Sequence, residues 1–304
     1  MRTCSDISDL IQEHGINVLL IGFPKCGTTA FADWLSSCPQ VDVSSPKETF
    51  LLCPEFASNL QRSASRGAEV EACYTPQSEG VLRMEATTLN AYSGALMEAA
   101  ADLPNVKCIA LTRDPVEATL SWHNQVINAG FQCSDDFTES WNHGLELDSQ
   151  TGQEFLTRYH EVSAHGQWCS RWVERIGHER CLMLRSVDLR DSPKSVKNRL
   201  EAFLDTELEV ADRPPERNKF SEPRSKFLYD TIRGSSLLRA FRGLEKHLQP
   251  LATVRRMIRD KIVLKPSKKK IGTEVESMLR DAFADDQAIL RKLAIQNASV
   301  WNEI

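Results

Sequence analysis

The sequence lacks long apolar runs, paired cysteines and the apolar core of a signal peptide. No apolar stretch approaches the roughly 20 residues that a membrane-spanning helix needs, so we expect no membrane anchor. The first fifteen residues contain no signal-peptide core, which predicts that the chain is not secreted. Nine cysteines, none in C-x-x-C spacing, favour reduced thiols over a disulfide framework. Together these absences predict a cytoplasmic protein.

Several chemical signatures are also missing. The seven histidines show neither H-E-x-x-H nor zinc-finger spacing, which predicts that no metal site is present. The absence of G-x-S-x-G argues against the nucleophile elbow of a hydrolase. The net charge of −5 disfavours nucleic acid and other polyanions as partners. What remains is a globular composition in 304 residues, enough for one large α/β domain.

Buried-strand patterns alternate with helical patterns along the chain. Such alternation predicts an α/β fold with a mostly parallel central sheet and helices on both faces. Ligands then bind beyond the carboxyl ends of the strands. The strand patterns cover Asn17–Gly22, Val41–Val43, Val81–Glu85, Val106–Thr112 and Arg180–Arg185. The helical patterns cover Thr28–Ser37, Gly94–Ala101, Pro115–Asn128, Glu154–Ile176, Pro193–Leu204, Phe227–Leu248 and Glu274–Ala294. Residues 49–79 are predicted to form a loop or short helices, 129–153 a polar broken segment and 212–226 a loop.

Residues 18–29, VLLIGFPKCGTT, join a predicted strand to a predicted helix through a short loop between glycines. Gly22 ends the apolar run, Lys25 is the only lysine of the loop, and Gly27 precedes the helix. Unpaired N–H groups and the helix dipole make such a helix start an anion site. The ordinary nucleotide loop places a lysine directly after its second glycine, but Thr28 stands there. The loop therefore predicts a phosphate or sulfate site of a different kind.

Residues 106–121, VKCIALTRDPVEATLS, form a second candidate anion site. The strand pattern ends at Arg113, Asp114 is a suitable N-cap, and Pro115 suits the first helical position. Ser121 follows about two turns into the helix, so it shares a face with the helix start that Arg113 borders. A guanidinium and a hydroxyl can then meet at one anion.

The two motifs together resemble the sulfotransferases that use 3′-phosphoadenosine 5′-phosphosulfate (PAPS). The likeness is closest to the branch that holds bacterial sulfotransferases and the heparan sulfate sulfotransferase domains. It implies a three-layer, P-loop-like sulfotransferase fold in a single domain of residues 1–304. Within that domain, it implies a PAPS-binding core at about 16–125 and 178–204. The acceptor side would comprise about 49–80, 129–177 and 205–250, and a basic loop and helix would follow at 265–304.

The resemblance also assigns donor-binding residues. It implies that the loop residues hold the 5′-phosphosulfate and that Arg113 and Ser121 hold the 3′-phosphate. A late basic loop with a glycine covers the 3′-phosphate in this family. The donor candidates are therefore Lys25, Cys26, Gly27, Thr28, Thr29, Arg113, Ser121, Lys269, Lys270 and Gly272.

Sulfuryl transfer needs positioning, a cation at the leaving phosphate and a base for the acceptor. Lys25 is the candidate cation. The resemblance favours Glu48, in SPKETF, as the base, and Glu85 at the end of a predicted strand is the rival. Ala86 stands where the glycosaminoglycan branch has a lysine, so Lys47 is the candidate second cation. The transferred group carries less negative charge than a phosphoryl group, so no divalent metal is expected.

The sequence gives less information about the acceptor than about the donor. The acidic balance and nearby aromatic residues favour a small natural-product alcohol or amine, with a carbohydrate as the alternative. The candidate acceptor contacts are Phe50, Trp122, His123 and Phe131. Two other functions stay open. A P-loop kinase or NTPase would require magnesium, and a non-catalytic nucleotide-binding protein would bind desulfated donor (PAP) without turnover. The oligomeric state is not predicted.

Overall fold

The computed structural model describes residues 2–56, 73–76, 79–129, 134–149, 152–215, 221–223, 264–266 and 272–301. The chain divides into one compact unit of residues 1–215 and 272–304 and a second of residues 216–271. In the second unit, β6 (Ser221–Pro223) pairs antiparallel with β7 (Leu264–Pro266). The single sulfotransferase domain of residues 1–304 stays a prediction. All the elements below belong to the first unit.

A five-stranded sheet forms the centre of the first unit, in the order β2-β3-β1-β4-β5. Each neighbouring pair of strands is parallel. The strands are β1 (Ile16–Leu20), β2 (Val41–Val43), β3 (Leu82–Glu85), β4 (Lys107–Thr112) and β5 (Cys181–Arg185). The predicted strands and the predicted parallel sheet are confirmed, with ends that differ by two residues at most.

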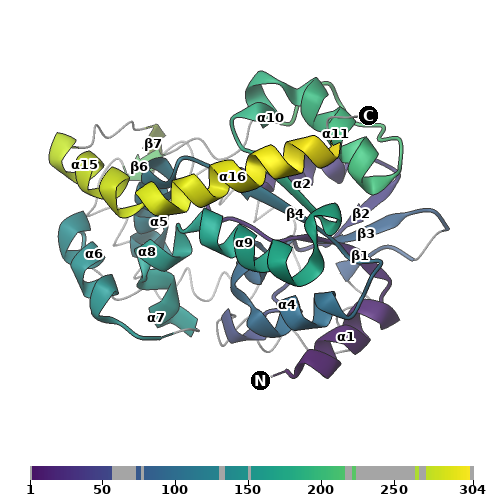
Figure 1. The fold of residues 1–304 in the computed structure, drawn as a ribbon, viewed down its shortest axis with the longest axis horizontal. Helices are drawn as coiled ribbons and strands as arrows, with labels where there is room; N and C mark the ends of the chain where they lie inside the picture. The colour runs from purple at the N-terminus through teal and green to yellow at the C-terminus, as the bar shows by residue number, and fades with distance from the viewer. Residues whose placement is uncertain are drawn as a thin grey trace. The chain divides into compact units, whose positions relative to one another are not determined.

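Helices cover both faces of this sheet (Figure 1). Helices α1 (Cys4–Glu13) and α4 (Gly94–Ala101) pack together on one side. Helices α2 (Thr28–Leu35), α10 (Asp188–Asp191) and α11 (Pro193–Leu204) lie on the other side. Helix α5 (Pro115–Ala129) follows β4 directly. The predicted three-layer α/β fold is therefore confirmed.

Two predicted helices are wrong as single elements. The predicted helix Glu154–Ile176 consists of α7 (Gly152–Thr157), α8 (Tyr159–Val162) and α9 (His165–Ile176). The backbone leaves the helical region at Arg158, with ψ 75°, and at Ala164, with ψ 64°. The predicted helix Glu274–Ala294 consists of α15 (Thr273–Ala282) and α16 (Ala284–Trp301), separated at the buried Phe283. Helix α16 then packs along α9 (Figure 1).

Among the described helices, α1, α6 and the short α10 were not predicted. Helix α1 begins with a capping box between Thr3 and Asp6 and buries Ile7 and Ile11. Helix α6 (Phe137–Glu146) begins where the Asp136 side chain accepts from Glu139 N, so the prediction of a broken segment at 129–153 is wrong there. The remaining short elements are η1 (Pro54–Phe56), η4 (Thr88–Tyr92) and η5 (His178–Arg180). The predicted helix at 227–248 lies outside the described residues.

Among the described helices, none combines the length and hydropathy that a bilayer crossing requires.

Candidate active site

The loop between β1 and α2 is shaped by its glycines. Gly22 has φ 136°, and a Cβ there would lie 3.1 Å from Ala91 Cβ and 3.3 Å from Thr88 O, so only glycine fits. Hydrogen bonds in both directions between Gly22–Phe23 and Leu111 bind the loop to β4, at 2.9 and 3.0 Å. The loop therefore starts from a fixed point at the sheet edge.

The end of the loop leaves the start of α2 open. Gly27 is the N-cap of α2, has φ 86°, is exposed, and receives no cap from a described side chain. The first N–H groups of α2 are thus available to an anion. Thr28 is buried and Thr29 is half-buried. The segment after β5 borders this point, since a Cβ at Gly27 would lie 3.8 Å from Ser186 Cβ.

Lys25, in the loop after β1, and Arg113, directly after β4, both approach one face of α5. Lys25 Nζ donates to Gln125 Oε1 at 3.1 Å. Arg113 donates from Nη1 to Lys25 O at 3.1 Å and from Nε and Nη2 to Glu117 at 3.0 and 2.9 Å. Glu117, Ser121 and Gln125 follow each other at four-residue intervals, so they share this face of α5. Ser121 therefore lies on the face that both cations approach.

The environment of the loop alters two of its titratable side chains. Burial, and then the charge of Arg113, lowers the pKa of Lys25 below that of an ordinary lysine. Burial raises the pKa of Cys26 to about 12. The Cys26 thiol faces the core, where Sγ lies 3.9 Å from His165 Nε2. The Cys26 backbone N–H donates to Phe23 O at 3.2 Å, so the donor-binding role expected for Cys26 stays a prediction.

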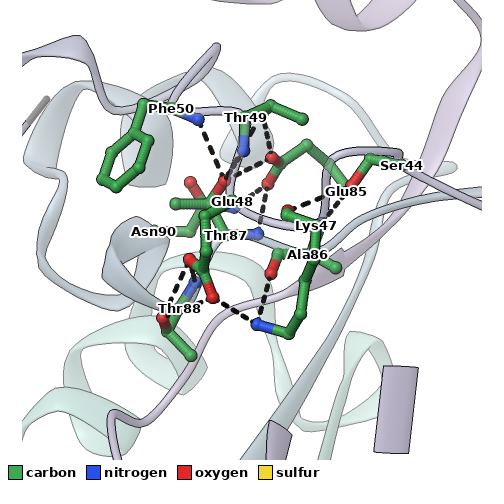
Figure 2. Close-up of polar contacts among 10 residues, drawn as sticks. All are labelled: Ser44, Lys47, Glu48, Thr49, Phe50, Glu85, Ala86, Thr87, Thr88 and Asn90. Atoms are coloured by element: carbon green, nitrogen blue, oxygen red, sulfur yellow. Dashed lines mark hydrogen bonds and ion pairs between the residues drawn. The ribbon is translucent and has the colours of Figure 1, made fainter. Parts of the chain in front are cut away.

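Glu48 and Lys47 form an ion pair at the end of β3 (Figure 2). The Glu48 carboxylate also accepts from Thr88 N at 2.9 Å and from Thr88 Oγ1 at 3.0 Å. Lys47 Nζ donates to Ala86 O at 3.0 Å. The Lys47 ammonium therefore lies beside Ala86, the position at which the glycosaminoglycan branch has a lysine. The Glu48 side chain is 37% exposed and that of Lys47 is 17% exposed. Glu48 is thus both fixed and accessible.

Glu85 lies at the same strand end but is fully buried. Its carboxylate accepts hydrogen bonds from Thr49 Oγ1, Thr87 N, Thr87 Oγ1 and Asn90 Nδ2. Burial raises the pKa of Glu85, and these hydrogen bonds oppose the shift. The two candidate bases therefore occupy different environments within one small region.

The candidate acceptor contacts are mostly packed into the protein. Trp122 is buried and donates to Leu156 O at 2.8 Å. His123 is buried, its Nδ1 lies 3.0 Å from the Tyr159 hydroxyl, and its ring meets Phe137 edge-on. Phe50 is buried with φ 56°. Phe131 lies outside the described residues.

The late basic loop is described only at its end. Lys269 and Lys270 lie outside the described residues, and Gly272 is the exposed N-cap of α15. Helix α15 is joined to the start of α5 by an ion pair of 2.8 Å between Arg280 and Asp114. The end of the basic segment therefore leads into a helix that contacts the residue next to Arg113.

Sequence reasoning did not identify Glu117, Gln125, Thr88 or Ser186. Helical spacing from Ser121 could have identified the first two. The places of Thr88 and Ser186 in the site depend on contacts between distant parts of the chain. Thr88 binds the carboxylate of Glu48, forty residues away, and Ser186 lies beside Gly27. Among the described residues, no three His, Cys, Asp or Glu side chains gather as a metal site.

Three comparisons with known proteins bear on this site. A family model described as a sulfotransferase domain matches residues 16–236. Bifunctional heparan sulfate N-deacetylase/N-sulfotransferase 1 of Caenorhabditis elegans is 23% identical over 193 residues, and that of Caenorhabditis briggsae is 23% identical over 194. Each alignment covers 62% of this chain but only 22% of the relative, so the chain matches about a fifth of those proteins.

A solved structure shares the fold. The sulfotransferase from Alicyclobacillus acidocaldarius has a TM-score of 0.62 and 18% identity, with 94% of this chain and 98% of that chain covered. The family match spans well over half of the sequence and contains both anion motifs. The chain therefore belongs to the sulfotransferase domain family.

Proposed function

We propose that this enzyme transfers a sulfuryl group from PAPS to a hydroxyl or amine of a small-molecule acceptor. The observation that carries the proposal is the approach of Lys25 and Arg113 to one face of α5, beside the open N-terminus of α2. A donor with phosphate groups on both the 3′ and the 5′ oxygen of its ribose suits such paired sites. Its 5′ side would contact Lys25, Thr29 and the backbone N–H groups of Gly27 and Thr28, and its 3′-phosphate would contact Arg113 and Ser121.

Bound PAPS would supply an activated sulfuryl group. Glu48 would accept the proton of the acceptor, while the acceptor oxygen or nitrogen forms its bond to sulfur. The bond from sulfur to the phosphate oxygen breaks, and its electron pair leaves with PAP. Lys25 would stabilise the charge that develops on that oxygen. Lys47, paired with Glu48, would hold the carboxylate in position to accept the proton.

The different environments of the two glutamates support Glu48 as the base. The Glu48 carboxylate is partly exposed and can reach an acceptor. The Glu85 carboxylate is fully buried, and hydrogen bonds from three residues occupy it. A base must contact the proton that it removes, so accessibility favours Glu48.

A carbohydrate is the second candidate acceptor. The net charge of −5 favours a neutral or cationic small molecule. The relatives that are named for heparan sulfate modification favour a carbohydrate instead. A kinase is less well supported, because β4 ends in Thr112-Arg113 without the acidic residue that would bind magnesium.

Titration calorimetry with PAP and with ATP tests the donor assignment. We expect PAP to bind and ATP to bind far more weakly, because only PAP carries the 3′-phosphate that Arg113 would recognise. Heat from ATP without heat from PAP would contradict the proposal. A screen of labelled PAPS against alcohols, amines and sugars, with products identified by mass, would then name the acceptor class.

A further inference from the structure

The buried carboxylate of Glu85 takes no part in the transfer just described, yet it has more polar partners than Glu48 (Figure 2). Two of these partners are the hydroxyls of Thr49 and Thr87, which donate to Oε1. The other two are Thr87 N and Asn90 Nδ2, which approach Oε2. A fully buried carboxylate with partners of this kind organises the groups that contact it.

The hydroxyls of Thr49 and Thr87 also accept hydrogen bonds from the backbone of residues 49–51. Because Thr87 Oγ1 donates to Glu85, its lone pairs are free to accept from Thr49 N at 3.0 Å and Phe50 N at 3.1 Å. Thr49 Oγ1 donates to Glu85 in the same way and accepts from Leu51 N at 3.1 Å. Three successive backbone N–H groups, at 49, 50 and 51, therefore end on hydroxyls that Glu85 orients.

This segment needs such support. Phe50 has φ 56°, a left-handed conformation that is unfavourable for an aromatic residue. Glu48 directly precedes the three fixed N–H groups, and its carboxylate binds Thr88, which directly follows Thr87. Glu48 is therefore adjacent in sequence to Thr49, and Thr88, which binds the Glu48 carboxylate, is adjacent to Thr87. Thr49 and Thr87 are both hydrogen-bond partners of Glu85.

We propose that Glu85 is a positioning residue, which fixes Glu48 and Lys47 through the hydroxyls of Thr49 and Thr87. This inference rests on the proposed function, in which Glu48 is the base. It separates the roles of the two carboxylates: Glu48 exchanges the proton, and Glu85 sets the position of the loop that carries it.

Two substitutions of Glu85 distinguish positioning from proton transfer. Glu85→Gln removes the basic carboxylate but keeps the length and the Oε1 acceptor. Asn90 can turn its amide to accept from the new amide, because Asn90 Oδ1 has no hydrogen-bond partner within the described residues, so Thr87 N is the one donor that loses its acceptor. Glu85→Asp keeps a basic carboxylate but is one methylene too short to reach both hydroxyls. A positioning role requires Asp to be the more harmful change, and a base role requires Gln to be.

The experiment measures release of PAP from PAPS, using the screened acceptor and, in parallel, water alone. We expect Glu85→Gln to lower kcat about threefold to tenfold and Glu85→Asp by about a hundredfold, with KM for PAPS changed less than twofold. The acidic limb of the pH–rate profile should persist in Glu85→Gln, because Glu48 is still present. Loss of that limb, or greater damage from Gln than from Asp, would overturn the inference.

Thr87 provides a second test that needs no acceptor. Thr87→Val removes the hydroxyl and keeps the shape of the side chain. Thr87→Ser, the control variant, keeps the hydroxyl and removes the methyl group. Amide hydrogen exchange should accelerate in the peptide covering residues 48–51 in Thr87→Val, and Thr87→Ser should recover the protection. Unchanged exchange in Thr87→Val would contradict the positioning role. If the wild type binds no PAP at all, the proposed function fails, whatever these variants do.

Discussion

The two halves of the candidate site are built by different means. The donor side, residues 22–29, relies on backbone: positive φ at its glycines and free N–H groups at the start of α2. The base side, residues 44–51, relies on side chains, with hydroxyls and carboxylates that hold the loop against β3 and η4. A site built from backbone groups depends on a few residue types at fixed positions within one short segment. A site built from side chains depends on pairs of residues that are distant in the sequence.

The comparison predicts different consequences for binding and turnover. Damage to the donor side should weaken PAP binding or the stabilisation of its leaving phosphate. Damage to the base side should lower turnover and leave PAP affinity intact.

The largest effect is expected for Lys25→Ala. Loss of the ammonium should lower kcat by on the order of a hundredfold, equal to ~3 kcal/mol of transition-state stabilisation. Single-turnover rates with labelled PAPS measure it, and circular dichroism checks the fold. Lys194→Ala, at an exposed position of α11, is the matched control and should behave as wild type. Full activity in Lys25→Ala would remove this lysine from the mechanism.

Glu48→Gln should have the next largest effect. Removal of a general base lowers kcat by roughly a hundredfold, while calorimetry should find PAP affinity within about twofold of wild type. Glu79→Gln, an exposed glutamate that precedes β3, serves as the control. A large loss of PAP affinity in Glu48→Gln would mean that the two halves are not separable in the way proposed.

Gly22→Ala tests the point where the two halves touch. The new Cβ would press on Ala91 Cβ and Thr88 O while φ is 136°, so we expect a loss of about 1–3 kcal/mol in unfolding free energy and weaker PAP binding. Gly80→Ala separates strain from crowding, because Gly80 also has positive φ but has no atom within 4 Å of its Cβ position. Chemical denaturation should rank Gly22→Ala as clearly the less stable variant.

Glu117→Gln should have the smallest effect, and in the opposite direction. In the donor-free chain the Glu117 carboxylate occupies Nε and Nη2 of Arg113, where it competes with an incoming phosphate. The pair is exposed, so its removal should tighten PAP binding only a few-fold, by about 0.2–1 kcal/mol. Glu276→Gln, which breaks a similar exposed pair with Arg280, is the control. Weaker PAP binding in Glu117→Gln would show that the carboxylate orients Arg113 instead of competing with its ligand.

The sequence places the donor-side residues in two short motifs, and their role in donor binding stays a prediction. Gly22, Lys25 and Gly27 lie within six residues, and Arg113 is separated from Ser121 only by helical spacing, so local rules were enough. The base side joins Glu48 to Thr88 and Thr49 to Glu85, across forty and thirty-six residues. No periodicity encodes such pairs, and only the family resemblance favoured Glu48 over Glu85. The structure adds a difference in burial, since Glu48 is partly exposed and Glu85 is fully buried.

The helices show the same limit. The sequence pattern continued through Arg158 and Ala164 without a proline, and its one glycine, Gly166, lies inside α9. Nothing local therefore predicted the breaks between α7, α8 and α9. At α1 and α6 the signals were present in Thr3-x-x-Asp6 and Asp136-x-x-Glu139, and capping rules could have identified both helices.

Gly22 has a further consequence for how such an enzyme could evolve. Its missing side chain lets the loop carrying Lys25 rest directly on Thr88, the residue that holds Glu48. The proposed donor loop and the residue that holds the proposed base are therefore in direct contact, with no intervening side chain to absorb a change. A substitution at Gly22 would displace both, so we expect variation in acceptor choice to arise elsewhere.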